Sequence, residues 1–267
     1  MNTLFEQHSD SSRPVLLLIN GLLADYTSYD SLAFLARESF HVLRYNTCGQ
    51  ELVSLSDVNT HKVYSLMDHI NFLIKVLDHH QIQSPIYLCG LSNGGRIALK
   101  FAELFPKRVV KVAAFDTYDQ ISPMLALKLN AWKQAHEVGG AVLRFDVSSP
   151  WIWGESFFHE KRDFILSFRE KILQSLSVQK SMEVSALING AIKDTDNLDR
   201  IDLEKIECPV LLGVGKEDLL TTPSLHLEMV KKLKQGQLIE IEKSGHASLV
   251  ENPMIMKKHI LPFFAQE

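Results

Sequence analysis

The sequence predicts an α/β protein, in which a mostly parallel central sheet is flanked by helices. Short runs of branched and leucine-rich residues alternate with longer segments of helical period along most of the chain. Most of the short runs are apolar at nearly every position, as strands covered on both faces are. Between about Tyr118 and Asp202 the alternation stops and only helical patterns appear. The sequence therefore also predicts a helical subdomain inserted into the α/β protein.

Six short runs have the composition of buried strands, and turn residues follow them. These runs are Val15 to Ile19, Val42 to Tyr45, Ile86 to Cys89, Val109 to Phe115, Val210 to Val214 and Leu238 to Ile241. Between the early strands, Ser65 to His80 places leucine and isoleucine side chains on one stripe, which is typical of a helix that packs on a sheet. Similar patterns predict helices over Asn93 to Leu104, Pro223 to Leu233 and Met254 to Phe264.

The predicted insert has three helical stretches and contains all three tryptophans of the chain. The stretches are Pro123 to Glu137, Asp163 to Leu176 and Val178 to Ala191. We expect residues 119–202 to form the insert, and residues 1–118 and 203–267 to form the α/β core. The aromatic side chains either form the small core of the insert or line an apolar substrate pocket. The candidates for such a pocket are Met124, Leu125, Trp151, Trp153 and Phe157.

Composition and charge exclude several classes of function. The 267 residues are 46% hydrophobic and 22% charged, the balance of an ordinary globular protein. With 28 Lys and Arg against 32 Asp and Glu, the net charge of −4 offers no attraction to nucleic acids or acidic membranes. No apolar run approaches the roughly 18 residues that span a bilayer, and Met1 to Asn20 lacks the pattern of a signal peptide. We therefore expect a cytoplasmic protein without nucleic-acid partners or a membrane span.

The cysteines indicate the same compartment. Cys48, Cys89 and Cys208 are odd in number and lack the spacing of metal ligands, which argues against a disulfide framework and against a zinc site. We expect a reducing compartment, no bound metal and no cofactor, and we assign the three thiols no role. The sequence predicts no particular oligomeric state.

The most informative motif follows the predicted strand Ile86 to Cys89. There the chain reads Gly90-Leu91-Ser92-Asn93-Gly94-Gly95 and continues into a predicted helix. This Gly-x-Ser-x-Gly pattern is typical of a nucleophile elbow, in which serine occupies a strained strand-to-helix turn and glycines allow strand and helix to approach closely. The N–H groups at the start of the helix, including that of Asn93, then point to where an oxyanion would form. We predict that Ser92 is a nucleophile.

A serine hydroxyl needs a base to take its proton and a carboxylate to orient that base. His246 follows the predicted strand Leu238 to Ile241, and Asp218 follows Val210 to Val214, so both lie on loops after strands in the order Ser, Asp, His. Asp116, after Val109 to Phe115, is a rival for the acid because its loop opens at the same edge of the sheet. Glu217 is a weaker rival.

These motifs together resemble the α/β-hydrolase fold family, and the resemblance covers nearly the whole chain. It is carried by Leu18 to Leu22, Tyr45 to Gly49, Gly90 to Gly95, Gly215 to Asp218, Ser244 to His246 and Glu251 to Pro253. The resemblance implies an α/β-hydrolase fold with a catalytic triad of Ser92, Asp218 and His246. It also implies an oxyanion hole formed by the backbone N–H groups of Leu22 and Asn93. The helical insert would then be the cap domain of the family.

The chain departs from the family pattern in three places. Asn20-Gly21 stands where the family commonly has His-Gly, which keeps the glycine and the backbone donor, and we expect activity to survive this. Asn46 to Gly49 replaces an Asp-x-Arg-Gly motif, so the usual ion pair is missing and the stability of this region must come from elsewhere. Only about a dozen residues precede the first long strand, so the antiparallel edge of the sheet is expected to be shortened or lost.

The predicted nucleophile limits the reaction. A carboxylate at position 92 would suggest dehalogenase or epoxide hydrolase chemistry, whereas serine suggests attack on an acyl carbonyl. We expect a serine esterase that cleaves a carboxylic ester, thioester or lactone with an apolar acyl portion, and a small-molecule acyl substrate as its partner.

Three alternatives stay open at this level. The regions Asn20 to Gly21 and Ala24 to Ser39 also look similar to acyltransfer enzymes of this fold. Ser92 to Arg96 resembles members that catalyse elimination or C–C cleavage, for which an anionic substrate would require a basic pocket in the cap. A member that binds a ligand without catalysis is the third alternative.

Overall fold

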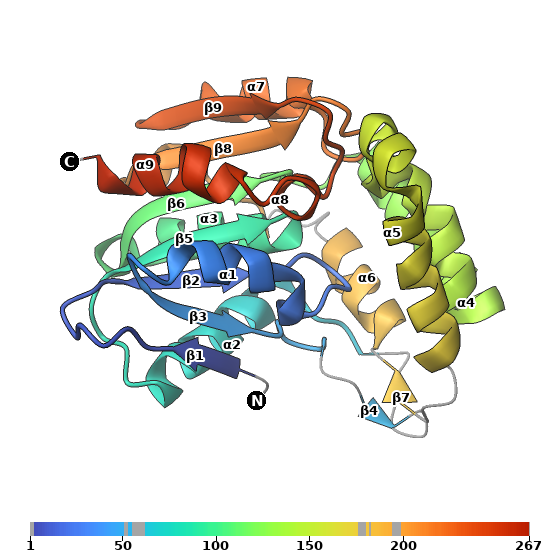
Figure 1. The fold of residues 1–267 in the computed structure, drawn as a ribbon, viewed down its shortest axis with the longest axis horizontal. Coiled ribbons are helices and arrows are strands. Elements are labelled where there is room, and N and C mark those ends of the chain that lie inside the picture. Colours follow the sequence, from blue (N-terminus) through green and yellow to red (C-terminus); the bar gives the residue numbers. More distant parts are fainter. Residues whose placement is uncertain are drawn as a thin grey trace.

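The computed structural model describes residues 3–50, 53–54, 62–175, 180–181, 183–193 and 199–266. The strands of its main sheet are β1 (Thr3–Glu6), β2 (Val15–Ile19), β3 (His41–Tyr45), β5 (Ile86–Leu91), β6 (Val109–Phe115), β8 (Val210–Gly215) and β9 (Gly236–Ile241). They follow the order β1-β3-β2-β5-β6-β8-β9 across the sheet (Figure 1). All neighbouring pairs are parallel except β1 and β3. The structure confirms the predicted α/β class with a mostly parallel sheet.

All six predicted strands are present, and β2 and β6 have the predicted bounds. Each of the other four extends one or two residues beyond its predicted bounds at one end. The antiparallel edge, expected to be shortened or lost, is kept as the four-residue strand β1.

Helices cover both faces of the sheet, because the side chains of its strands alternate between two apolar cores. Leu17 of β2 belongs to one core, to which α2 (Leu66–His79), α3 (Asn93–Leu104) and α7 (Pro223–Val230) contribute. Leu16 and Leu18 belong to the other, which α1 (Asp30–Ala36) and α9 (Leu261–Ala265) cover. The short helix α8 (Ser248–Glu251) and a π-helical turn over Met256–Ile260 precede α9. Strand β2 is therefore fully buried, as its apolar sequence predicts.

The region predicted to be an insert consists mainly of three helices, α4 (Pro123–Ile152), α5 (Glu155–Ser175) and α6 (Val184–Ile192). They stand beyond the end of the sheet where β5, β6 and β8 finish (Figure 1). Below them in this view, β4 (Val53–Ser54) pairs with β7 (Lys180–Ser181). No helix within the described ranges has the length and hydropathy needed to cross a membrane.

The helical bounds in this region differ from the predicted ones. α4 continues to Ile152 across a kink at Gly139 and Gly140, whereas the sequence predicts an end at Glu137, because two successive glycines interrupt a helical pattern. α5 begins at Glu155, eight residues before the predicted start. The helix predicted over Val178 to Ala191 is wrong at its start, because Lys180–Ser181 form β7 and α6 begins only at Val184. Residues 178–179 and 182 of that stretch lie outside the described ranges.

Candidate active site

Ser92 lies between the end of β5 and the start of α3, in a strained backbone conformation with φ +55° and ψ −120°. Two hydrogen bonds hold it there: its N–H donates to Phe115 O at 2.8 Å, and the Thr117 hydroxyl donates to Ser92 O at 2.8 Å. The close approach of α3 depends on glycine. A Cβ at Gly94 would lie 2.1 Å from Ile19 O at the end of β2. The motif therefore forms the elbow that the sequence predicts.

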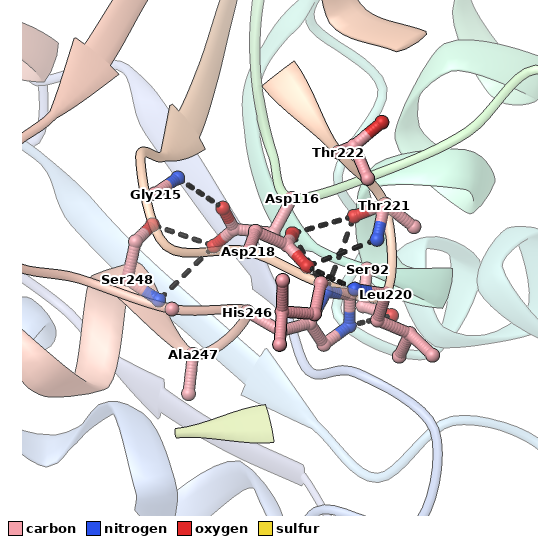
Figure 2. A network of polar contacts seen from close by, with 12 residues as sticks. Ser92, Asp116, Gly215, Asp218, Leu220, Thr221, Thr222, His246, Ala247 and Ser248 are labelled. Carbon is pink, nitrogen blue, oxygen red and sulfur yellow. Dashed lines mark hydrogen bonds and ion pairs between the residues drawn. The ribbon is translucent and has the colours of Figure 1, made fainter. Parts of the chain in front are cut away.

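His246 and Asp218 meet Ser92 in a continuous line (Figure 2). His246 Nε2 lies 2.8 Å from Ser92 Oγ, and His246 Nδ1 lies 3.0 Å from Asp218 Oδ2. Asp218 follows β8 and His246 follows β9, so parallel strands deliver both side chains to the same edge of the sheet. The structure thus brings together the three residues that the sequence nominates.

The Asp218 carboxylate is 2% exposed, yet it is well supplied with donors. Its Oδ1 accepts the N–H groups of Leu220 at 2.7 Å and Thr221 at 2.9 Å, and its Oδ2 accepts the Thr221 hydroxyl at 2.8 Å. Burial raises the pKa of Asp218, but the neighbouring His246 and these hydrogen bonds outweigh it and lower the pKa to about 2. Asp218 is therefore an anion at neutral pH, suited to orient His246 and to stabilise its protonated form.

Asp116, the rival acid, has different partners. Its Oδ1 accepts Gly215 N–H at 2.8 Å, and its Oδ2 accepts the N–H and hydroxyl of Ser248 at 3.0 and 2.6 Å (Figure 2). Burial and the nearby Asp218 charge raise the pKa of Asp116 well above its usual range. Through these hydrogen bonds Asp116 joins the loop after β8 to the loop after β9, beside His246. None of these bonds reaches the His246 imidazole.

Glu217 and Glu251 connect the helical insert to the His246 loop. Glu217 accepts the N–H of Ser156 at 2.8 Å and also accepts the Ser156 hydroxyl. Glu251 accepts N–H groups from Gly154 at 3.3 Å, Gly245 at 3.0 Å and Ala247 at 3.2 Å. Glu217 thus binds the junction of α4 and α5 instead of the imidazole.

The loop after β2 reaches Ser92 directly. A Cβ at Gly21 would lie 3.5 Å from Ser92 Cβ and 3.3 Å from Leu91 O. Leu22 follows, and Asn93 begins α3 on the other side of Ser92. Neither the Leu22 nor the Asn93 N–H has a hydrogen-bond acceptor in the described part of the chain, so both donors remain available to a ligand atom.

The region that lacks the family's ion pair is held by amide side chains. Asn46 accepts Tyr26 N–H at 2.9 Å and donates to Asp25 Oδ2 at 2.9 Å. Gln50, which is 0% exposed, makes several hydrogen bonds to the loop that contains Leu22. Sequence reasoning did not single out Gln50 or Thr221, and it named Glu251 only within the motif Glu251 to Pro253. The turn before Thr221 carried a local signal, because an aspartate side chain often accepts backbone N–H groups about two residues ahead, as Asp218 does.

The structure places the five predicted pocket residues in three groups. Met124 is 60% exposed and Trp151 is 36% exposed, with the Lys128 ammonium 4.4 Å from the centre of the Trp151 ring. Trp153 stacks on Phe157 and Phe168 at ring separations of 5.8 and 6.0 Å. The third group contains Leu125 with other apolar residues that pack with Leu22 and Leu220 beside the site. These other residues are Tyr118, Leu129, Trp132, Val184, Ile188 and Ala191, with Val147 and Ile152 at the margin.

Other reactive side chains do not join this site. No cluster of three or more His, Cys, Asp or Glu side chains suited to a metal ion occurs among the described residues. Burial raises the pKa of the Cys89 thiol to about 12, which keeps it un-ionised.

The family model for the alpha/beta hydrolase fold matches residues 14–253. The chain belongs to the α/β-hydrolase fold family. Membership confirms the resemblance drawn from the motifs and supports hydrolase activity.

The relatives of this α/β hydrolase share little sequence identity with it. It is 23% identical to the "Putative carbamate hydrolase RutD" of Pseudomonas syringae pv. syringae (strain B728a), over 98% of this chain and 96% of the relative. Among solved structures, it is similar to MGS-M2, an alpha/beta hydrolase from a Medee basin deep-sea metagenome library, with a TM-score of 0.86 and 22% identity over 99% and 94% of the two chains. It is also similar to the enol-lactonase from Burkholderia xenovorans LB400, with a TM-score of 0.81 and 19% identity over 99% and 96% of the two chains. At this low sequence identity, the similarity to these two solved structures establishes the fold alone.

Proposed function

We propose that the protein is a serine hydrolase that cleaves a carboxylic ester, thioester or lactone through an acyl-enzyme on Ser92. The observation that carries the proposal is the unbroken contact from Ser92 Oγ through His246 to the anionic Asp218 carboxylate. This arrangement allows a weakly acidic hydroxyl to act as a nucleophile at neutral pH.

The proposed reaction has two halves. Ser92 Oγ attacks the acyl carbon while His246 Nε2 takes the hydroxyl proton, and Asp218 holds the Nδ1–H tautomer and stabilises the imidazolium. The Leu22 and Asn93 N–H groups donate to the carbonyl oxygen as it becomes an oxyanion. His246 then protonates the leaving alcohol or thiol, and a water molecule activated by the same base releases the acid.

The relatives' names are compatible with this chemistry. Carbamates and enol lactones, the substrates in two of those names, both present an acyl carbon to a nucleophile. We propose an apolar acyl portion for the substrate here, because apolar side chains of α4 and α6 pack against Leu22 and Leu220 beside the nucleophile. In this proposal residues 119–202 act as a cap that covers the site.

A panel of p-nitrophenyl esters of two to eight acyl carbons tests the proposal. Wild-type protein is expected to hydrolyse them with accumulation of an acyl adduct of the matching mass, and Ser92→Ala is expected to show neither. Added short-chain alcohols separate the alternatives, because an acyltransferase would give mainly the new ester. A folded wild-type protein that forms no acyl adduct with any ester would contradict the proposal.

Anionic acyl substrates are a second candidate, favoured by one residue of the cap. Arg144 lies on α4, its Nε is buried without a hydrogen-bond partner among the described residues, and burial lowers its pKa to about 10. Unpaired guanidinium groups of this kind suit a carboxylate. The ester panel therefore includes hydrogen succinate and hydrogen glutarate esters, and Arg144→Met is expected to weaken only these if the candidate is correct.

A further inference from the structure

Gln50 lies on a turn that brings its side chain under the loop after β2. Its N–H donates to Thr47 O at 3.0 Å across this turn, in which Gly49 has φ +80°. A Cβ at Gly49 would also lie 2.4 Å from the Tyr64 ring, so glycine is required there for two reasons. The turn delivers Gln50 to a position where its side chain is 0% exposed.

The Gln50 amide has partners on both of its ends. Its Nε2 donates to Gly21 O at 3.1 Å, to Ala24 O at 3.3 Å and to Thr47 Oγ1 at 2.6 Å. Its Oε1 accepts the N–H of Leu23. If the amide were flipped, its oxygen would lie against the carbonyl oxygens of Gly21 and Ala24, which cannot donate a hydrogen bond. The partners therefore fix which atom is Nε2 and which is Oε1.

These contacts bracket Leu22 on both sides. The Gly21 C=O and the Leu22 N–H belong to one peptide group, and in a planar trans peptide they point in opposite directions. When Gln50 binds Gly21 O, it therefore turns the Leu22 N–H away from itself. The Gln50 bond to Leu23 N–H fixes the next peptide group, at a residue whose φ is +63°.

Gly21 lies against the nucleophile, since a Cβ there would come within 3.5 Å of Ser92 Cβ. Glycine permits its peptide group to rotate at little steric cost, so this orientation needs an external restraint. Gly21 O also accepts the Ala24 N–H at 3.3 Å and Asn20 Nδ2–H at 3.4 Å, and both contacts are longer than the one from Gln50. We propose that Gln50 is a positioning residue of this enzyme, which aims the Leu22 N–H at the oxyanion by holding the Gly21–Leu22 peptide from behind.

The inference rests on the proposed function and makes it more specific. An oxyanion donor acts mainly in the transition state, so its misalignment lowers kcat and leaves ground-state binding nearly unchanged. Substitution of a residue that only stabilises the fold would lower the melting temperature, but it would not lower kcat while leaving ground-state binding unchanged. The two roles are therefore distinguishable by kinetics and by inhibitor binding.

The test compares Gln50→Met, which removes both ends of the amide, with Gln50→Glu, which keeps the acceptor and the shape but replaces the donor. Each variant is measured for kcat and KM on an ester, and for binding of a trifluoromethyl ketone and of the matched methyl ketone. The first ketone forms a tetrahedral adduct with Ser92, and the second reports ground-state binding. Arg108→Met is the matched control, because it removes a side-chain bond to Ile82 O at the opposite edge of the sheet.

We expect both Gln50 variants to lose about 10²-fold in kcat, the cost of one oxyanion donor. The affinity for the trifluoromethyl ketone should fall by a similar factor, while KM and the affinity for the methyl ketone stay within about threefold. If Gln50→Met does not fold, the isosteric Gln50→Glu carries the comparison alone. Folded variants that match Arg108→Met in all four quantities would overturn the inference while leaving the proposed function standing. A wild-type protein that neither hydrolyses esters nor binds the tetrahedral analogue would overturn the proposed function, and this inference with it.

Discussion

At the residue scale, two buried aspartates lie near the candidate base His246, and their carboxylate oxygens contact different groups. Asp218 touches His246 Nδ1 at 3.0 Å, whereas Asp116 accepts hydrogen bonds from Gly215 and Ser248. The sequence could place both after strands of the same sheet edge, but it could not show which side chain turns toward the imidazole. That choice depends on the turn from Asp218 to Thr221, where two N–H groups fix the carboxylate.

We predict that Asp218→Asn and Asp116→Asn affect different properties. Asp218→Asn should lower kcat by up to about 10⁴-fold, because the amide favours the wrong imidazole tautomer. Asp116→Asn should keep most of the activity and lower stability by roughly 1–3 kcal/mol, because one of its two accepting oxygens becomes a donor facing an N–H group. Ester hydrolysis and urea unfolding of both variants check this. Equal losses of activity in the two folded variants would count against the assignment of Asp218.

At the scale of elements, the packing of α3 on the sheet decides whether the elbow forms. The helix starts directly after Ser92, and its first turn lies against the end of β2, where Gly94 leaves no room for a side chain. The same contact places the loop that contains Leu22 next to the nucleophile. A single close approach therefore sets both the strained serine and the neighbouring backbone donor.

We predict that Gly94→Ala is severely destabilising, by roughly 3 kcal/mol or more, because its Cβ would overlap backbone atoms of β2 that cannot move alone. Gly140→Ala is the control, since Gly140 has φ +67° but no atom within 4 Å of the added Cβ. With ψ −160°, Gly140 has a backbone conformation that is nearly restricted to glycine, so the substitution should cost about 1–3 kcal/mol. Urea unfolding of both variants measures the difference, and a Gly94→Ala protein as stable as Gly140→Ala would show that α3 packs differently.

Features that depend on a short, contiguous stretch of sequence could be predicted, whereas features that depend on distant contacts could not. Strand β2 is apolar throughout, β6 is apolar except at Lys111, and the elbow is one contiguous motif, so the strands could be predicted with their bounds and the elbow with its position. The continuation of α4 beyond its kink and the support of the Leu22 loop by Gln50 could not. Gly139 and Gly140 interrupt the helix with non-helical backbone angles, but the pair of glycines does not indicate that a helix resumes after them. Gln50 acts on residues about 27 positions away through contacts that no local pattern records.

At the scale of the whole molecule, the junction of α4 and α5 and the loops of the candidate site share contacts. His246 N–H donates to Ile152 O at 2.8 Å, and Glu251 accepts N–H groups from both Gly154 and the His246 loop. A Cβ at Gly245 would lie 2.3 Å from Gly154 N, so the two segments touch through backbone alone. The position of the candidate base is therefore tied to the junction between α4 and α5.

This shared contact predicts a pH dependence of stability. Burial, only partly offset by backbone N–H donors, raises the pKa of Glu251 to about 7 from an ordinary value of 4.5. The fold therefore favours protonated Glu251, and the stability gained from it is complete below about pH 4.5 and is lost as the pH rises through about 7. The loss is at most roughly 3 kcal/mol, from about 1.4 kcal/mol per unit of pKa.

Urea unfolding at pH 5, 6.5 and 8 measures this dependence. Glu251→Gln should be less stable overall, because its amide faces N–H groups, but its free energy of unfolding should decline less between pH 5 and 8 than that of wild type. Glu38→Gln, at an exposed surface site, should decline as wild type does. An unchanged slope in Glu251→Gln would contradict the assignment.

The measurement that tests the central claim most directly is the intact mass of the protein after incubation with a fluorophosphonate. The account predicts one adduct on wild type and none on Ser92→Ala, with labelling greatly slowed in His246→Gln, because the reagent reacts with a serine only when a base activates it. The Ser92→Ala variant should keep the wild-type melting temperature within a few degrees, which ensures that the comparison concerns folded protein. An adduct that persists in Ser92→Ala, or a folded wild type that never reacts, would contradict the assignment of Ser92 as an activated nucleophile.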